Sequence, residues 1–415
     1  MPPTCSYLDS SSGFSFSHLH YLKYSPTLNL LFAFQPVKTK VSSPGKDKMN
    51  TILLPVSTNR DQNNLSYKTQ TNPRMAEKRK ITLKDIAREL KLSPSTVSRA
   101  LNGYPSLSEE TIQMVKEYAE KNNYVPNTMA VNFRKNRTSM IGMVVPQIVH
   151  HFFSTTISGA LETAKKNGYS IMLAQSFDYL KDEVLACQHL LGMGVDGLLI
   201  SVSNETREAE HLSYFLEEGK PVVQFDKITD YLPGPKLVVD DFQAAYDAVT
   251  HLIKQGYRNI AHLSGRMNVK NSFERFSGYK KALEDHGLEF REELVKNCRD
   301  ISEKEGFDFT QELISSTNPP DAIFCITDLV ALGAMNCLKS NGIAIPDQVG
   351  LMGFSNWMLS EYITPTLSSV DQHGFEMGKK ATEMLLDLLK NHDLGEDQTV
   401  EMKTKLVILK SSMKG

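Results

Sequence analysis

Apolar residues recur at helical spacing in three short stretches between residues 81 and 124. Such spacing gives each stretch one apolar face and predicts three short amphipathic helices. The middle stretch also places Val97 and Leu101 in a core. The other residues expected to share the apolar faces are Ile86, Ala87, Leu90, Ile112, Val115, Tyr118 and Ala119.

Beyond residue 137 the pattern changes to compact apolar runs separated by helical stretches. Short apolar strands that alternate with helices favour parallel sheets covered on both faces. One core of this length would exceed the usual size, so two subdomains are expected. The apolar runs lie at 141–145, 170–175, 194–201, 221–225, 236–240, 259–264, 321–326 and 349–354.

Residues that are typical of helix starts and helix ends bound the three predicted helices. Thr82, three residues before Asp85, is typical of a capped helix start, and Ser93 before Pro94 marks a second one. Asn102-Gly103 would stop the second helix, and Ser108 would cap the third. Two short helices with a tight joint predict a helix-turn-helix. A surface helical hairpin is the plainer alternative.

Four motifs in this order resemble one known family. They are TLKDIA (82–87), SPSTVSRALNG (93–103), NNYVPN (122–127) and IGMVVP (141–146). Together they resemble the LacI family of bacterial transcription regulators, from about Ile81 to the C-terminus. The resemblance implies an N-terminal all-α helix-turn-helix DNA-binding domain and an α/β core like that of periplasmic binding proteins, built from two parallel-sheet subdomains.

The resemblance also implies a division of the chain. The DNA-binding domain would span 75–124, a hinge helix 125–137 and the effector-binding core 138–415. Within the core, the N-subdomain would take about 138–238 and 374–402, and the C-subdomain about 239–371 and 403–415. Three crossovers would lie near Val239, Gln372 and Lys403.

Residues 1–74 fit none of these patterns. They are rich in Ser, Asn, Tyr and Pro, and their apolar runs are far shorter than the roughly 20 residues of a membrane helix. No order of basic, apolar and small residues there is typical of a signal peptide. We expect a disordered extension or upstream sequence, with the natural start at Met75; a functional tail is the alternative.

Charge is unevenly distributed along the chain. From Met75 to Arg137 there are 12 Lys and Arg against 7 Asp and Glu, a balance of +5, so a formal net charge of −2 leaves −7 for the rest. A basic head on an acidic body suits phosphate binding. The scattered cysteines lack metal-ligand spacing and indicate reduced thiols in a cytoplasm. They are Cys5, Cys187, Cys298, Cys325 and Cys337.

The second helix of the predicted helix-turn-helix would enter the major groove with its N-terminal residues toward the base edges. Arg99 suits a bidentate pair with guanine, while Thr96 and Ser98 suit phosphate oxygens or, alternatively, ordinary capping. Pro94 would contribute only shape and apolar contact. The expected DNA-binding residues are Thr82, Pro94, Ser95, Thr96, Ser98, Arg99, Asn102, Asn127 and Phe133.

Asn127 and Phe133 belong to the expected hinge. Asn127 would cap a helix too short to persist alone in water. In the family this segment folds on operator DNA and inserts a leucine into the minor groove. Phe133 stands at that position and is also a known wedge. A linker phenylalanine packed on the core is the alternative.

The resemblance implies a small effector, most often a sugar or nucleobase, bound where strands end. Asp and Arg suit a polyol, because a carboxylate accepts from paired hydroxyls and a guanidinium offers a fork of donors. Each candidate has a structural alternative; Asp328, for example, could simply cap its helix. The candidates are Phe152, Phe153, Asp226, Arg275, Thr327, Asp328 and Ser355.

The chain departs from the family pattern in its expected pocket. Many relatives have an acidic residue at Ser355, an aromatic residue at Ile301 and a proline at His151. Trp357, the single tryptophan, could supply the missing ring, or it could pack in the core or at a subunit contact.

These patterns favour a cytoplasmic, homodimeric, ligand-controlled regulator on a pseudo-palindromic operator. A secreted sugar receptor of the same core fold would need an export signal and no basic head. An enzyme is not favoured, because GxSxG, P-loop and HExxH patterns are missing. We expect double-stranded DNA, a carbohydrate effector and a second copy as partners, with no catalytic residues, cofactor, metal or membrane.

Overall fold

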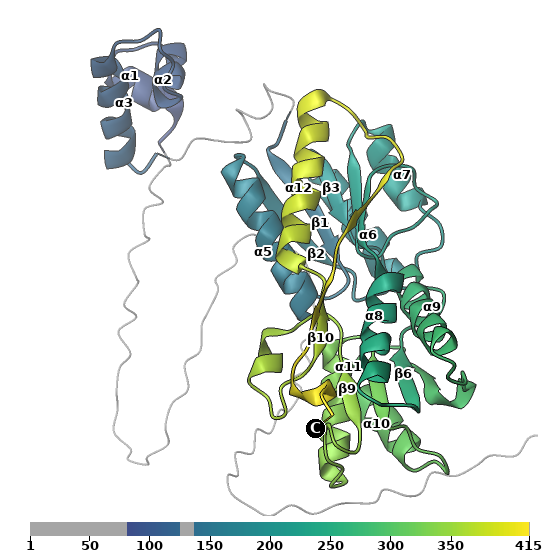
Figure 1. The fold of residues 1–415 in the computed structure, drawn as a ribbon. Helices are drawn as coiled ribbons and strands as arrows, with labels where there is room; N and C mark the ends of the chain where they lie inside the picture. Colours follow the sequence, from purple (N-terminus) through teal and green to yellow (C-terminus); the bar gives the residue numbers. More distant parts are fainter. Residues whose placement is uncertain (1–80, 125–136, 415) are drawn as a thin grey trace, which may run out of the picture. The chain divides into compact units, whose positions relative to one another are not determined.

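The computed structural model describes residues 81–124 and 137–414 (Figure 1). The first range forms a three-helix head around a small core that includes Ile86, Val97 and Val115. The predicted helix starts are confirmed, because Thr82, Ser93 and Ser108 are the N-caps. The helices are α1 (Leu83–Glu89), α2 (Pro94–Leu101) and α3 (Glu109–Lys121).

A six-stranded sheet forms the centre of what we call the N-lobe. Its strand order is β11-β5-β4-β3-β1-β2, and all its pairings are parallel. The strands are β1 (Met140–Val145), β2 (Ser170–Gln175), β3 (Gly197–Ile200), β4 (Val222–Phe225), β5 (Lys236–Val239) and β11 (Thr399–Met402).

Helices cover both faces of this sheet. Ile141 and Met143 of β1 pack on the face covered by α5 (His151–Lys166) and α12 (Gly374–Asn391), whereas Val144 faces α6 (Leu180–Gly192) and α7 (Glu210–Glu217). Alternate side chains of one strand therefore enter two cores, which explains why β1 is apolar at nearly every position.

A second sheet forms what we call the C-lobe. Its order is β7-β6-β8-β9, again parallel, with α8 and α9 on one face and α10 and α11 on the other. Its elements are β6 (Ile260–Ser264), β7 (Val295–Asn297), β8 (Ala322–Cys325), β9 (Gly350–Met352), α8 (Asp241–Lys254), α9 (Lys270–Asp285), α10 (Glu303–Ile314) and α11 (Asp328–Ser340).

A small antiparallel pair and three short 3₁₀ helices complete the described core. The pair is β10 (Ser369–Asp371) with β12 (Lys405–Val407), and the 3₁₀ helices are η1 (Glu292–Leu294), η2 (Met358–Glu361) and η3 (Lys410–Ser412). The predicted fold class is confirmed: a helix-turn-helix head precedes a core of parallel sheets covered by helices.

The chain passes between the lobes three times. It leaves the N-lobe between β5 and α8, returns between β10 and α12, and leaves again between β11 and β12. Figure 1 shows the last passage as the yellow strand that runs from one lobe to the other. Each lobe is therefore assembled from separate segments of the chain.

Three helix pairs pack closely at glycine residues. A Cβ on Gly378 of α12 would lie 1.8 Å from the Thr156 carbonyl oxygen of α5, and one on Gly333 of α11 would lie 1.9 Å from the Glu303 oxygen of α10. Gly278 of α9 meets α8 in the same way, at 2.2 Å from the Phe242 oxygen. A side chain at these positions would force the helices apart.

Two further findings concern the described residues alone. Four of the cysteines, Cys187, Cys298, Cys325 and Cys337, are free and buried, whereas Cys5 lies outside the described ranges. None of the helices within 81–124 and 137–414 is long and apolar enough to cross a membrane.

Candidate functional site

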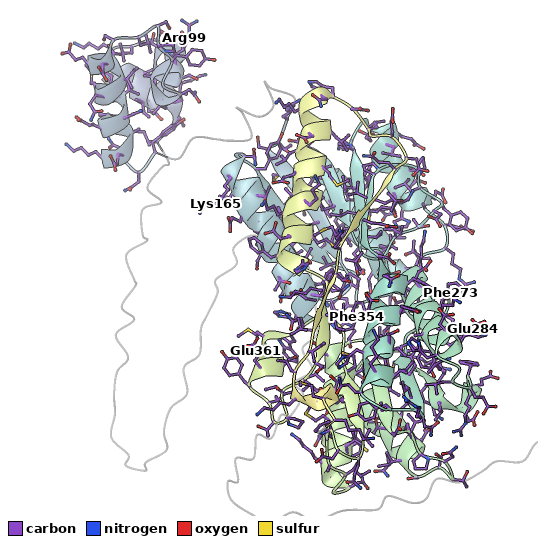
Figure 2. All side chains as sticks on the ribbon, viewed as in Figure 1. Arg99, Lys165, Phe273, Glu284, Phe354 and Glu361 are labelled. Atoms are coloured by element: carbon purple, nitrogen blue, oxygen red, sulfur yellow. The ribbon has the colours of Figure 1, made fainter. Side chains whose placement is uncertain are left out.

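The head presents the N-terminal half of α2 at its surface. Pro94, Ser95 and Arg99 are exposed, while Val97 and Ala100 on the opposite face are buried. Arg99 projects from the head and has no ion pair among the described residues (Figure 2). α2 therefore offers a free guanidinium one turn from two small residues, the arrangement that base recognition requires.

Several predicted DNA contacts also hold the head together. The Thr82 hydroxyl accepts from the Asp85 amide, and the Asp85 carboxylate accepts from the Thr82 amide at 2.9 Å. The Ser93 hydroxyl lies 2.7 Å from that of Ser95 and 2.8 Å from that of Thr96. Polar residues at the start of α2 therefore have a capping role whether or not they touch phosphate.

Ser98 and Asn102, which are also predicted to bind DNA, differ in exposure. The Asn102 side chain donates to the Ser98 carbonyl oxygen at 2.7 Å, so it closes the end of α2 while remaining exposed. The Ser98 side chain is half-buried. The two hinge candidates, Asn127 and Phe133, lie outside the described residues.

The core holds a cavity that contains about 930 Å³ of space free of atoms, part of it open to solvent. Its lining comes from segments that follow β1, β2, β3, β4, β6, β7, β8, β9 and β10, together with α9. Ligands of open parallel sheets bind at the carboxyl ends of strands, so the position fits a binding site. All seven predicted effector residues line it: Phe152, Phe153, Asp226, Arg275, Thr327, Asp328 and Ser355.

Asp226 follows β4 in a left-handed backbone conformation, with φ 59°. Its carboxylate is buried, and the nearest donor is the Ser201 hydroxyl at 3.5 Å. Burial, with the nearby Asp241 carboxylate, raises the pKa of Asp226 to about 6. A buried carboxylate so weakly bonded would gain from the hydroxyl donors of a ligand.

Most of the Arg275 guanidinium contacts other parts of the protein, which the sequence did not indicate. It lies on α9 and not beside a strand end, and its Nε donates to Asp241 at 2.7 Å while Nη1 donates to the Ile326 carbonyl oxygen at 2.8 Å. Its guanidinium carbon also lies 3.6 Å from the centre of the Phe354 ring. Since these contacts are all internal, Nη2 is what remains for a ligand.

Asp328 does not cap α11, because the N-cap is Thr327, whose hydroxyl accepts from the Val330 amide. The Asp328 carboxylate instead accepts from the Trp357 amide and the Ser369 hydroxyl, each at 2.6 Å. Burial raises its pKa to about 6, although these hydrogen bonds oppose the shift. Asp328 thus fixes the segment that carries Trp357, an effect the sequence did not reveal.

Aromatic side chains form another part of the wall. Phe152 and Phe153, at the start of α5, are nearly buried, and their rings meet edge to face at 5.2 Å. Trp357 lines the cavity, which favours the ring-supplying role over a core position. Ile301 lines it as well, and the Ser355 hydroxyl donates to Gln372 at 3.1 Å.

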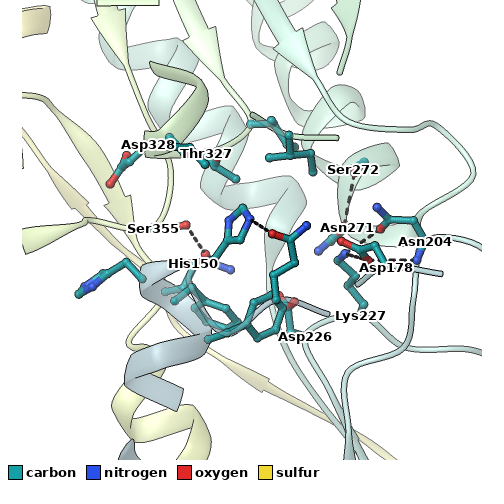
Figure 3. A pocket seen from close by; sticks show the side chains of 18 of the residues that line it. His150, Asp178, Asn204, Asp226, Lys227, Asn271, Ser272, Thr327, Asp328 and Ser355 are labelled. Carbon is teal, nitrogen blue, oxygen red and sulfur yellow. Dashed lines mark hydrogen bonds and ion pairs between the residues drawn. The ribbon is translucent and has the colours of Figure 1, made fainter. Parts of the chain in front are cut away.

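Sequence reasoning missed a polar group at the other end of the cavity. Thr327, Asp328 and Ser355 lie at one end in Figure 3, whereas Asn204, Asn271 and the ion pair of Lys227 with Asp178 lie at the other. Asp178, Asn204 and Lys227 each follow a strand of the N-lobe. Reading every polar residue that follows a predicted strand would have found these three. No group of three or more metal-binding side chains gathers in the part of the chain that the structure describes.

Comparisons with known proteins match both parts of the chain. Residues 82–127 match the family model of bacterial regulatory proteins of the lacI family. Residues 138–408 match the model of periplasmic binding proteins and sugar binding domain of the LacI family. Together, the matches cover the head and almost all of the core.

Individual relatives match the chain over almost their whole length. Catabolite control protein A of Priestia megaterium is 30% identical over 80% of this chain and 99% of its own. The transcriptional repressor CytR of Escherichia coli is 29% identical over 79% and 95%.

Solved structures are similar too. A complex of the transcriptional regulator CelR with cellobiose is 25% identical over 80% of this chain and 100% of its own, with a TM-score of 0.60. The lac repressor dimer bound to operator and an anti-inducer shares the fold at 22% identity over 80% and 99%, with a TM-score of 0.72.

Proposed function

Because the chain belongs to the LacI family of bacterial regulatory proteins, we propose that it controls transcription as a homodimer on a pseudo-palindromic operator and responds to a carbohydrate bound in the core cavity. It would act in the cytoplasm, where its DNA lies. Double-stranded DNA, the effector and a second copy are the partners.

One observation carries the DNA-binding half of this proposal. α2 is capped, buried on one face, and presents Pro94, Ser95 and Arg99 on the other. A helix of this kind reads bases with its N-terminal residues while the cap holds its entry angle. The proposed contacts are Thr82, Pro94, Ser95, Thr96, Ser98, Arg99, Asn102, Asn127 and Phe133.

The effector half is supported by the cavity. It combines buried aromatic rings with a few fixed polar groups, such as Asp226 and Arg275, which is the usual composition of a small-molecule site. The buried carboxylates of Asp226 and Asp328 have no nucleophile and base arranged with them among the described residues, and the relatives are regulators, so we propose no catalysis. A receptor without a DNA role would not explain the head.

Trp357 offers a direct test of the cavity. As the single tryptophan, and a cavity residue, it should change its fluorescence when a sugar binds. We would screen neutral and acidic sugars by this signal and by thermal shift, since a ligand selective for the folded state raises the melting temperature. Trp357→Phe should abolish the optical signal but leave the thermal shift.

Operator binding is tested with the sugar so found. The parent should bind one DNA sequence far more tightly than unrelated DNA, and the sugar should change that affinity. A protein that binds the sugar but never discriminates between DNA sequences would contradict the regulatory proposal.

A further inference from the structure

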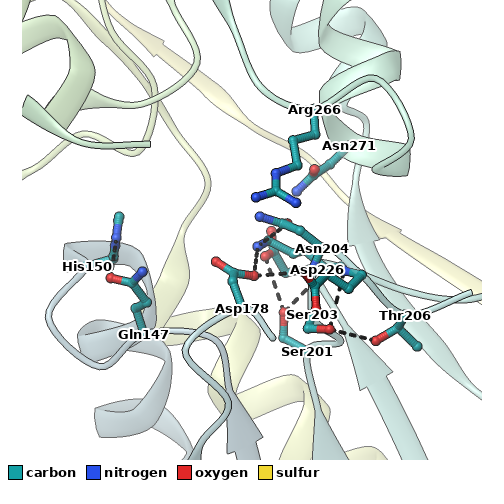
Figure 4. A network of polar contacts seen from close by, with 12 residues as sticks. Gln147, His150, Asp178, Ser201, Ser203, Asn204, Thr206, Asp226, Arg266 and Asn271 are labelled. Atoms are coloured by element: carbon teal, nitrogen blue, oxygen red, sulfur yellow. Dashed lines mark hydrogen bonds and ion pairs between the residues drawn. The ribbon is translucent and has the colours of Figure 1, made fainter. Parts of the chain in front are cut away.

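The end of the cavity away from Trp357 collects hydrogen-bond donors that have no acceptor. Figure 4 shows the Arg266 guanidinium beside Asn271 and Asn204. Asn204 follows β3 of the N-lobe, while Arg266 and Asn271 come from the loop after β6 and the start of α9. Both lobes therefore contribute to this end.

Arg266 carries the charge of this group. Its Nε donates to the Arg299 carbonyl oxygen at 3.2 Å, which holds the side chain in place. In the described ranges no carboxylate lies within ion-pair distance of its guanidinium, and its two terminal nitrogens make no hydrogen bond. A fixed guanidinium with both of these nitrogens free is the usual partner of a carboxylate or phosphate.

The side-chain amides of Asn204 and Asn271 both have their nitrogen atoms free to donate. Lys227 can only donate, and its ammonium lies 2.7 Å from the Asn204 side-chain oxygen, so the Asn204 nitrogen must be on the other side of that amide. Asn204 is nearly buried. The Asn271 oxygen faces the Ser272 hydroxyl at 3.5 Å, which leaves its nitrogen free as well.

Nearby charges do not cancel this group. Lys227 and Asp178 form an ion pair at 2.7 Å and neutralise each other. Asp300 also lines this end, but it is exposed, so water screens its charge. Arg266 has no ion-pair partner in the described ranges, and Asn204 and Asn271 lie beside it in Figure 4, with the buried Asp226 beyond Asn204.

From this geometry we propose that the donor group of Asn204, Arg266 and Asn271 binds an anionic oxygen group on the effector, so that the natural ligand is an acidic sugar. The inference rests on the proposed effector function of the cavity and narrows its ligand class. The sugar hydroxyls would lie toward Asp226, and the phosphate or carboxylate substituent toward Arg266.

The test compares matched pairs of ligands on the full chain, read by Trp357 fluorescence and thermal shift. The pairs are glucose with glucose 6-phosphate, glucose with glucuronate, and ribose with ribose 5-phosphate; inorganic phosphate alone is also titrated. Arg266→Gln removes the charge but keeps donors, and Arg207→Gln makes the same change on an exposed arginine that does not line the cavity.

In the parent, the acidic member of at least one pair should bind about ten-fold or more tightly than its neutral partner, as a charged hydrogen-bonded contact implies. Arg266→Gln should abolish that advantage, so that the acidic and neutral members of the pair bind equally. Arg207→Gln should keep the advantage. Comparing the sugar phosphate pairs with the glucuronate pair shows whether the preferred anionic group is a phosphate or a carboxylate.

Two results would overturn the inference, and they differ in whether the proposed effector function also fails. If neutral sugars bind and their acidic partners bind no better, or if the advantage persists in Arg266→Gln, the anion site is wrong and the effector proposal stands. If no sugar of either kind binds, the carbohydrate proposal fails and the anion site fails with it.

Discussion

Arg99 is the exposed side chain of α2 that is best suited to read a base, and its contribution can be separated from that of its neighbours. Arg99→Ala should cost about 1–3 kcal/mol of operator binding and relax preference at one base pair in each half-site. The measurement is operator affinity across a set of single-base variants. An unchanged base preference would remove Arg99 from direct readout.

Thr96→Ala is the comparison within the same helix. A lost phosphate contact weakens all sequences alike, whereas loss of the hydroxyl contact with the cap residue Ser93 lowers head stability. The Thr96 hydroxyl lies 2.8 Å from that of Ser93. Measuring melting temperature beside DNA affinity therefore distinguishes the two roles.

Asp226 should make the ligand-free protein sensitive to pH. Its usual pKa is 3.8, and burial raises it to about 6 in the folded protein. The folded state thus holds the proton more tightly, so stability is lost as pH rises from about 4 to 6 and stays lower above that. Asp226→Asn should raise the free energy of unfolding at pH 7 by up to about 3 kcal/mol.

The gain from Asp226→Asn should shrink as pH falls and disappear below the usual pKa of 3.8, where the parent carboxyl is protonated in both states. Asp230→Asn serves as the control, since Asp230 is exposed and its ion pair with Lys270 is also exposed. Denaturant unfolding at several pH values measures both. A gain that is equal at all pH values would show that ionisation of Asp226 is not its cause.

Much of the site was predictable residue by residue, but not its internal bonding. Apolar runs and the family motifs placed Phe152, Asp226 and Thr327 at strand ends, and all three line the cavity. The partners of Arg275 and Asp328 come from segments distant in sequence, such as Asp241 and Ser369. No local pattern encodes those contacts.

At the level of elements, most strands were visible in the sequence, including the edge strands β2 and β9, but the edge strands β7 and β11 were not. β1 and β8 are continuous apolar runs because both faces are covered. β7 (VKN) and β11 (TVEM) lie at sheet edges, where half-exposed polar residues replace that signal. Short strands of this kind have too few residues to show a period.

The close glycine contacts between helices were likewise invisible, because spacing alone does not tell how near two helices come. Gly378→Ala should lower the free energy of unfolding by about 1–3 kcal/mol or more, since its Cβ would overlap the Thr156 oxygen of α5. Chemical denaturation measures this loss. Gly192→Ala is the matched control.

Gly192 is also a helical glycine, at the end of α6, but no atom lies within 4 Å of the position of its Cβ. Alanine there should be neutral or stabilise by up to about 1 kcal/mol. Equal effects at both positions would show that helix contact does not explain the glycine at 378.

At the scale of the whole molecule, we propose that ligand binding changes the arrangement of the lobes and thereby the affinity for DNA. Such coupling is typically about 1–3 kcal/mol and requires different ligand affinities for the two arrangements. We predict that Arg275→Ala removes the effector response of DNA binding. Phe133→Ala, in the expected hinge, should instead weaken operator binding and leave effector affinity without DNA unchanged.

Arg275 must be tested together with Asp241. Removing the arginine alone leaves Asp241 as a buried, unpaired carboxylate, which should destabilise the protein by about 3–5 kcal/mol. Arg275→Ala with Asp241→Asn should recover part of that loss and still fail to respond. A double variant that responds to effector like the parent would show that Arg275 is not needed for the response.

The three passages between the lobes set the order in which a new chain can complete its structure. The N-lobe needs α12 to cover one face of its sheet and β11 to finish its edge, and these elements lie at 374–391 and 399–402. The C-lobe needs β12 and the buried Ser411 and Ser412, which come later still. During synthesis, neither lobe is therefore complete when its first strands and helices have formed. The part of the N-lobe sheet that α12 covers stays exposed until α12 has left the ribosome, and it would be a natural target for chaperones.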